Sequence, residues 1–221
     1  MTLFMNKNRV SSALWVSFIA VATLMSCSSS QETAMVPVNA PEVAPLAEAV
    51  VPSPDPRVGL DAGLFDAEEA LWNLEVLSQT PPPEKFIGKT NSDLAFKGNY
   101  AFQGNYNGVI VWDISNPANP VLVNDYECPA SQSDVSVYGN LLFVSGEGLE
   151  GRIDCGTEGV REAVSEVRLR GIRIFDITDI QNPEYVANVQ TCRGSHTHSV
   201  LKDPNDNENI YVYVSGSYVV R

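Results

Sequence analysis

The segment Gly108-Val-Ile-Val-Trp-Asp-Ile-Ser-Asn-Pro117 decides the fold, because a second version of it occurs at Gly171-Ile-Arg-Ile-Phe-Asp176. A repeated segment also precedes each copy, and it starts at Ser92-Asp93 and again at Ser133-Asp134. A period of about 40 residues, made of short apolar runs and Gly-Asn turns, is typical of the blades of a β-propeller. Asp93 and Asp134 are 41 residues apart, whereas Asp113 and Asp176 are 63 residues apart. The second unit therefore carries an insertion of 22 residues, within Glu147–Arg170.

Each unit is predicted to form four strands, and the fold class is all-β. The expected strands are residues 93–96, 100–103, 109–114 and 121–126 in the first unit, and 134–137, 141–145, 172–177 and 185–189 in the second. Gly98-Asn99 and Gly139-Asn140 suit tight turns that need positive φ. A strand of a third unit follows near 210–218. Since propellers close with about four to eight blades, we expect residues 86–221 to be the N-terminal portion of a longer propeller, or the product of a truncated gene.

The segment 1–26 is typical of a secretory signal peptide. Lys7 and Arg9 give a positive start, and the apolar run that follows, Ala13–Met25, is too short to cross a bilayer as a helix. Leu24-Met25-Ser26-Cys27 resembles a bacterial lipobox, in which the cysteine becomes the lipidated first residue of the mature chain. The alternative is an ordinary cleaved signal with a chance cysteine. Because Asp does not follow Cys27, the lipobox predicts a lipid-anchored protein of the cell envelope, at the outer membrane.

Two further segments precede the repeats. Residues 27–60 contain six prolines between positions 37 and 56, which predicts an extended tether without a core. Residues 61–80 place Leu64, Ala67, Leu71 and Leu74 at helical spacing, and three prolines follow. This pattern predicts one short amphipathic helix that packs on the propeller as a cap.

The charge of the chain limits its partners. Without residues 1–26, which contain two basic and no acidic residues, the chain has 12 basic and 27 acidic residues, a net charge of −15 compared with −13 for the whole sequence. A chain this acidic is a poor candidate for binding nucleic acid through its surface field. We therefore expect no nucleic-acid partner.

The strand segments Val109-Ile-Val-Trp-Asp113 and Ile172-Arg-Ile-Phe-Asp176, each followed by a turn that ends in Asn-Pro, resemble the LVIVD repeat. That repeat occurs in exported bacterial and archaeal proteins and is thought to form a β-propeller. The resemblance covers roughly residues 90–218. It implies a cell-surface protein without an assigned reaction, and it supplies no catalytic residues.

The residues that could carry chemistry fall in loops that should meet. In a four-stranded up-and-down blade, the loop between the second and third strands lies at the same end as the connection to the next blade. The insertion is in the first kind of loop, whereas Cys128, Cys192 and Ser195–His198 are in the second kind. We expect all of them at one mouth of the propeller, where Asp93, Asp134, His196 and His198 form the candidate ligand face.

His196 and His198 are candidate metal ligands. By the repeat, His198 takes the place that Asp93 and Asp134 hold in the earlier units, with one extra residue in between. His196 precedes it by two residues, so both imidazoles would point to one side of a strand. Two histidines are half of a zinc or iron site, and further ligands would lie beyond residue 221. The alternative is that His198, like the two aspartates, hydrogen-bonds the backbone of the next turn.

The cysteines other than Cys27 are Cys128, Cys155 and Cys192, an odd number. An exported protein is expected to form one disulfide from them. Pairing Cys155, which lies in the insertion, with Cys128 or Cys192 would pin the insertion to the mouth. The sequence leaves the connectivity open.

These features predict a surface-anchored propeller that acts as a binding module for a protein or glycan partner at the cell surface. A metal-dependent enzyme using His196, His198 and a divalent metal at the mouth is the second hypothesis, and a structural envelope lipoprotein is the third. No catalytic triad, phosphate-binding loop or catalytic carboxylate pair is present in the sequence, so we assign no catalytic residues.

Overall fold

The computed structural model describes residues 50, 52–63 and 66–220. The expected signal peptide, Cys27 and most of the expected tether lie outside these residues. Residues 76–220 belong to one compact unit, and the described residues before them belong to a second one. All the strands that the structure describes lie in the first unit.

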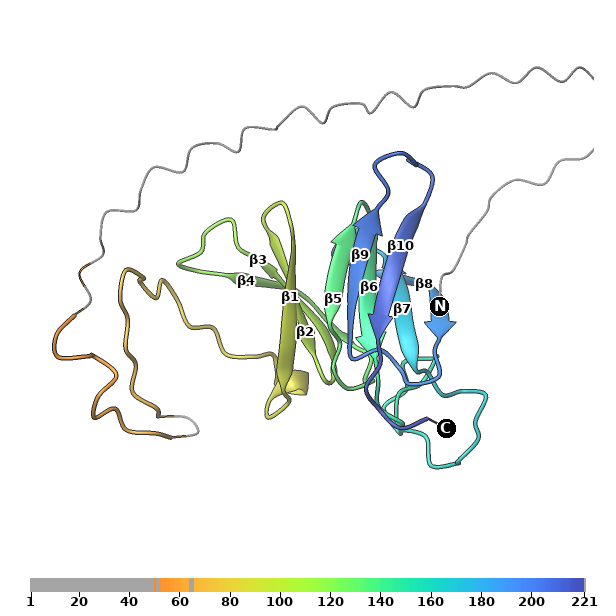
Figure 1. Cartoon of the computed structure of the whole chain (residues 1–221), viewed down its shortest axis with the longest axis horizontal. Helices are drawn as coiled ribbons and strands as arrows, with labels where there is room; N and C mark the ends of the chain where they lie inside the picture. Colours follow the sequence, from red (N-terminus) through yellow and green to blue (C-terminus); the bar gives the residue numbers. More distant parts are fainter. Residues whose placement is uncertain (1–49, 51, 64–65, 221) are drawn as a thin grey trace, which may run out of the picture. The chain divides into compact units, whose positions relative to one another are not determined.

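This unit contains two four-stranded antiparallel sheets and a hairpin (Figure 1). In both sheets the strand order follows the chain, β1-β2-β3-β4 in sheet 1 and β5-β6-β7-β8 in sheet 2, and the hairpin pairs β9 with β10. The strands are β1 Asn91–Lys97, β2 Tyr100–Asn105, β3 Gly108–Asp113, β4 Val121–Glu127, β5 Val135–Tyr138, β6 Leu141–Gly146, β7 Gly171–Asp176, β8 Glu184–Gln190, β9 Thr197–Lys202 and β10 Ile210–Ser215.

The eight strands expected for the two repeat units are confirmed, with ends that differ by at most two residues. The turns between the first two strands of each sheet contain Gly98 and Gly139, whose φ angles are 57° and 59°. Only glycine adopts this left-handed conformation without a steric cost, which explains why glycine occurs at the same point of both repeats.

The sheets are placed side by side through their first strands, since β5 contacts β1 and also β9 (Figure 1). One apolar cluster fills the space between sheets 1 and 2. Its buried members are Phe102, Val109, Val111, Cys128, Val135, Leu142, Val144, Phe175 and Ile177. In β3 the consecutive residues Val109, Ile110 and Val111 are all buried, because both faces of this strand are covered. A run without alternation is the expected sequence for such a strand.

The prediction of a helix over residues 61–80 is wrong. The described residues of this range form a turn, a bend and otherwise irregular chain, and the short 3-10 turn η1 (Glu84–Phe86) comes only after it. Asn73 has a φ of 55°, which a right-handed helix excludes. Leu71 and Leu74 of the expected apolar stripe are exposed, and a short helix whose stripe is not buried is marginal in water.

No helix in the described part of the chain is long and apolar enough to cross a bilayer.

Candidate functional site

The insertion meets both inter-sheet connections, as the repeat topology predicted. At its start, the backbone N–H groups of Glu147 and Gly148 both donate to the carbonyl of Ala130 in the β4–β5 connection, each at 3.1 Å. The N–H of Ser195 in the β8–β9 connection donates to the carbonyl of Gly146 at 3.0 Å. These segments therefore form one loop end of the molecule, and we use this name for it below.

A disulfide joins Cys128 at the end of sheet 1 to Cys155 in the insertion, across a sequence separation of 27 residues. The expected disulfide between the insertion and the loop end is confirmed, and of the two candidate partners Cys128 is the one used. Cys192 is a free, exposed thiol. Because Cys128 also belongs to the core between the sheets, the disulfide attaches the insertion to this core.

The buried arginine Arg173 fixes the same region. Its guanidinium donates to the carbonyls of Cys128 (2.8 Å), Pro129 (3.0 Å) and Arg152 (2.7 Å). It thus bridges the chain on both sides of the disulfide. Burial lowers the pKa of Arg173 to about 10, which still leaves the side chain charged at neutral pH. In sheet 1 the equivalent position is Ile110, so this cation replaces an apolar residue of the repeat.

Two more buried arginines organise the end of the insertion. Arg168 donates to the carbonyls of Leu149 and Ala163, at 2.7 and 2.9 Å. Arg170 donates to the carbonyls of Glu147 and Val219, at 3.2 and 2.9 Å. A loop has few backbone partners of its own, and buried carbonyls need donors. The arginines supply these donors.

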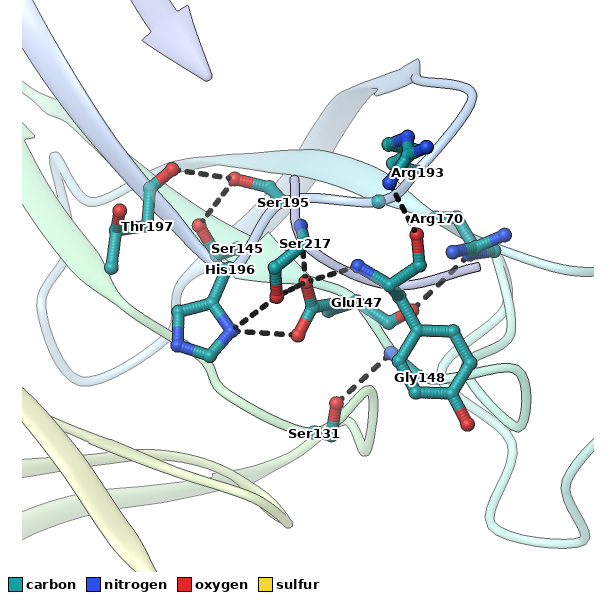
Figure 2. A network of polar contacts seen from close by, with 12 residues as sticks. Ser131, Ser145, Glu147, Gly148, Arg170, Arg193, Ser195, His196, Thr197 and Ser217 are labelled. Atoms are coloured by element: carbon teal, nitrogen blue, oxygen red, sulfur yellow. Dashed lines mark hydrogen bonds and ion pairs between the residues drawn. The ribbon is translucent and has the colours of Figure 1, made fainter. Parts of the chain in front are cut away.

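Glu147 is the centre of a polar network at the loop end (Figure 2). Its Oε1 accepts hydrogen bonds from the N–H and the hydroxyl of Ser217, at 2.9 and 2.8 Å, and from the N–H of Tyr218 at 3.1 Å. Its Oε2 lies 2.7 Å from Nδ1 of His196. Burial raises the pKa of Glu147, but the hydrogen bonds from His196 and Ser217 outweigh it, so the pKa lies below its ordinary value. The carboxylate therefore holds the segment after β10 against the insertion.

His198 has different surroundings from His196, although the two are close in sequence. Its side chain is fully buried, and Nδ1 lies 2.9 Å from Oγ of Ser145 and 2.9 Å from Oδ2 of Asp134. The Nε2 atom has no hydrogen-bond partner in the described part of the chain. Burial raises the pKa of Asp134, but the contacts with His198 lower it by more, and the net pKa is below its usual value. His196 is instead half-exposed and lies outside β9.

Asp93 and Asp134, the two aspartates of the repeat, have the same structural role. Oδ2 of Asp93 accepts the N–H of Val135 at 3.1 Å, and Oδ2 of Asp134 accepts the N–H of His198 at 2.8 Å. Each aspartate thus caps the first strand of the following unit. Since the N–H groups of Val135 and His198 donate the same hydrogen bond to the aspartate of the preceding unit, His198 is equivalent to Val135, and Thr197 stands in the aspartate's place. The expectation that His198 takes that place is wrong by one residue, because the backbone register needs no extra residue.

The histidines do not form a metal centre with other described side chains. No three His, Cys, Asp or Glu side chains among the described residues lie close enough together to hold a metal ion. Each Nδ1 already faces a carboxylate, Glu147 for His196 and Asp134 for His198. Ligation through the remaining nitrogens would require groups that the described residues do not provide.

A cleft of about 570 Å³ with polar and apolar lining residues opens at the loop end beside the disulfide. It lies between four segments: the chain that leads into β1, the β2–β3 turn with Tyr106 and Asn107, the β4–β5 connection, and the insertion. The residues that line it are Lys85, Gly88, Lys89, Thr90, Tyr106, Asn107, Glu127, Pro129, Ala130, Ser131, Glu150 and Thr157. The cleft therefore includes residues of the insertion and of the β4–β5 connection, whereas the β8–β9 connection contributes none of its lining residues.

The polar groups in the wall of the cleft are partly preorganised. The side-chain amide of Asn107, which is buried, donates to the carbonyl of Lys85 at 3.0 Å and to Oε1 of Glu127 at 2.8 Å. Lys85 also pairs with Asp125 at 3.3 Å, outside the cleft lining. In contrast, the ammonium of Lys89 and the carboxylate of Glu150 have no ion-pair partner among the described residues. Glu127 has no ion-pair partner among the described residues either, so the cleft presents available charges of both signs.

Comparison with known proteins identifies the repeat. The LVIVD repeat family matches residues 88–128. The chain contains an LVIVD repeat. No curated protein matches the sequence. Among solved structures, the crystal structure of the computationally designed Ika4 protein is similar at 15% identity and a TM-score of 0.29, over 66% of this chain and 100% of that chain. That likeness is too low to inform the fold or the function.

The matched LVIVD repeat corresponds to sheet 1 and ends at the disulfide cysteine Cys128. The residues that build the loop end lie mostly outside it, in the insertion of the second unit. Sequence reasoning located the insertion, the disulfide candidates and the histidines, but it missed Glu147, Lys89 and Arg173. For Arg173 the sequence contained a signal, because this arginine interrupts the apolar strand of the second unit at the position that corresponds to Ile110 in the first unit. For the other two the sequence contains no comparable signal.

Proposed function

We propose that sheets 1 and 2 and the β9–β10 hairpin are blades of a β-propeller, and that the protein is a surface-anchored binding module. The repeated up-and-down sheets, their contact through first strands and the LVIVD repeat support the propeller. The lipobox-like sequence before Cys27 supports the anchor and a place in the cell envelope. The disulfide fits an exported protein, because disulfides persist in oxidising compartments.

The observation that carries the binding function is the cleft at the loop end. Its walls are held by a disulfide, by Arg173 and by the Asn107 hydrogen bonds, so little order has to be gained on binding. Ser131, which lines the cleft, begins a run of three residues with left-handed φ angles of 53°, 47° and 53°, through Ser133. Non-glycine residues in this conformation are costly and gather at binding sites.

The partner that suits this cleft is a polypeptide segment exposed at the cell surface. Two lysines and two glutamates line the walls, and Lys89 and Glu150 leave charges of both signs available. A polypeptide offers both signs together with backbone donors and acceptors for Thr90, Thr157 and Ser131. A neutral glycan would leave both charges unmatched.

Site-specific crosslinking in cells tests this proposal. A photoreactive residue in place of Tyr106, at the rim of the cleft, is expected to yield a discrete adduct with an envelope protein, and the same residue at Val186 on β8 is the control. Lys89→Glu should abolish the adduct, whereas Lys202→Glu, which reverses a lysine on β9, should not. Equal crosslinking from Tyr106 and Val186, or an adduct that carries only glycan, would overturn the proposed polypeptide partner.

A further inference from the structure

Glu127 is the carboxylate that the fold holds in place in the wall of the cleft. It is the last residue of β4, directly before the disulfide cysteine Cys128, and it lines the cleft. Its Oε1 accepts a hydrogen bond from Nδ2 of Asn107 at 2.8 Å. Asn107 is only 8% exposed, and its Nδ2 also donates to the carbonyl of Lys85 at 3.0 Å. The position of the Glu127 carboxylate is therefore fixed before a partner binds.

The negative charge of Glu127 is not compensated by a cation of the described chain. Its hydrogen-bond partner Asn107 is a neutral amide, and no basic side chain among the described residues lies within ion-pair distance of Glu127. Lys85, which also lines the cleft, pairs with Asp125 at 3.3 Å instead. An ionised carboxylate can accept about four hydrogen bonds, so Glu127 retains acceptor capacity beside its bond from Asn107.

The other charges of the cleft also favour a cationic group. With Lys85 paired to Asp125, the lining leaves Lys89 as an available cation and Glu127 and Glu150 as available anions. The whole chain has a formal net charge of −13. A field of this sign steers cationic groups toward the protein.

Tyr106 adds an aromatic ring to the same cleft. It precedes Asn107 in the β2–β3 turn, it lines the cleft and it is 36% exposed. Its backbone N–H donates to the carbonyl of Thr90 at 2.9 Å, which holds the turn against the chain that leads into β1. The face of an aromatic ring attracts a cation. The cleft thus combines a fixed carboxylate with an aromatic ring.

Arginine suits these two groups better than lysine does. Its guanidinium is planar, donates hydrogen bonds in a fixed fork that matches a carboxylate, and stacks on aromatic faces. It is also more weakly hydrated than an ammonium group, so its transfer from water into the cleft is less costly. A cleft of about 570 Å³ has room for this side chain.

We propose that the cleft binds an arginine side chain of the partner polypeptide, with the guanidinium paired to Glu127 and placed on the ring of Tyr106. This inference rests on the proposed binding function, because it names the residue that anchors the partner in the cleft. Lys89 remains available for an acidic group of the same partner.

A peptide titration of the full chain carrying Cys27→Ser, which removes the expected lipidation site, tests the proposal. The probe is the blocked peptide acetyl-Ala-Arg-Ala-amide, and the NMR signals of the Tyr106 and Asn107 amides should shift as it binds. The same peptide with lysine in place of arginine should bind more weakly, and the norleucine peptide should cause no shift. Arginine and norleucine peptides that bind equally would rule out the arginine anchor.

A charge-removing variant assigns the binding to Glu127. Glu127→Gln preserves an acceptor for Asn107 and removes the charge, so the Kd of the arginine peptide should rise about tenfold. Glu184→Gln, on an exposed glutamate of β8, is the matched control and should leave the Kd unchanged. A Kd that is the same in Glu127→Gln and in the parent chain would overturn the proposal.

Crosslinking in cells separates this inference from the proposed function. A photoreactive residue at Thr157, on the insertion side of the cleft, leaves Glu127 and Tyr106 intact. The adduct should decrease strongly with Glu127→Gln and persist with Glu184→Gln. An adduct that is undiminished in Glu127→Gln would refute the arginine anchor and leave the polypeptide partner standing. If Thr157 gives no adduct in any variant, the proposed function fails and this inference fails with it.

Discussion

At the scale of single residues, one buried carboxylate determines how the loop end is held together. Glu147 accepts four hydrogen bonds, from the backbone and hydroxyl of Ser217, the backbone of Tyr218 and the ring of His196. Hydrogen bonds to a charged group are roughly twice as strong as those between neutral groups. The negative charge of Glu147 therefore contributes more to the stability of the loop end than the shape of its side chain.

We predict that Glu147→Gln, which preserves the shape and removes the charge, lowers the free energy of unfolding at pH 7 by about 1–2 kcal/mol. Denaturant titration measures this change. Glu184→Gln, on an exposed glutamate of β8, should change the stability by less than about 0.5 kcal/mol. An equal loss in both variants would contradict the role assigned to the network.

The lowered pKa of Glu147 predicts that the stability of the protein depends on pH. The folded-state pKa of Glu147 lies below its ordinary value of 4.5, and that of Asp134 below 3.8. A carboxylate with a lowered folded pKa contributes stability that is complete above its unfolded pKa and is lost as the pH falls through the folded pKa. The melting temperature should therefore be level near neutral pH and fall below about pH 4.5, with a smaller fall in Glu147→Gln. A melting temperature that rises on acidification would contradict this.

At the scale of elements, the insertion is a loop that the sheets hold from outside. Its attachments are the disulfide from Cys128 to Cys155 and the guanidinium of Arg173, and both reach into the core between sheets 1 and 2. The strands themselves need neither attachment, since sheet 1 forms the same four strands without an insertion. The disulfide and the Arg173 guanidinium therefore serve the loop end and its cleft.

Removing the disulfide tests this assignment. Cys128→Ser should lower the free energy of unfolding by roughly 3–4 kcal/mol, the value expected for releasing a loop of this length. Urea titration under oxidising conditions gives the number. Cys192→Ser, which removes the free thiol, should leave stability unchanged, and a comparable loss there would show that Cys192 takes part in the pairing.

Replacing Arg173 tests the second attachment. Arg173→Met fills the volume but leaves the carbonyls of Cys128, Pro129 and Arg152 without their donor, which should cost about 1–3 kcal/mol. The insertion should also become cleavable by protease while the sheets stay intact. Arg161→Met, on an exposed arginine of the insertion, is the matched control. If both variants resist protease equally, the guanidinium does not hold the insertion.

At the scale of the whole molecule, neighbouring sheets share one core. Phe102 and Val111 of sheet 1 pack in the same cluster as Val135 and Phe175 of sheet 2. The capping bonds from Asp93 and Asp134 connect each unit to the next. Such an array gains most of its stability from interfaces between units, so sheets 1 and 2 should unfold together.

Two phenylalanines of sheet 1 test this shared core. Phe102→Ala, in the buried cluster, should cost about 3–5 kcal/mol, and amide exchange should accelerate in both sheets. Phe96→Ala, on an exposed side chain of β1, should cost much less. If faster exchange were confined to sheet 1, the sheets would be independent folding units.

The sequence by itself determined the strands and their order. The repeat period and the Gly-Asn turns reflect local backbone conformation, which depends on neighbours along the chain. The unbroken apolar run in β3 indicates a strand that is buried on both faces. These signals also located the insertion and the loops that would meet at one end. The same kind of reasoning failed at residues 61–80, because helical spacing forms a helix only where the apolar stripe is buried.

Only the tertiary structure decided which side chains meet at the loop end. Glu147 contacts His196 and Ser217, residues 49 and 70 positions away, and nothing in the local sequence encodes such a contact. The choice of Cys128 over Cys192 as partner of Cys155, and the place of His198 in the register, likewise depend on how sheets 1 and 2 and the hairpin are packed. The periodicity of the sequence identifies each strand from local residues, whereas contacts between distant loops form only after the sheets have packed.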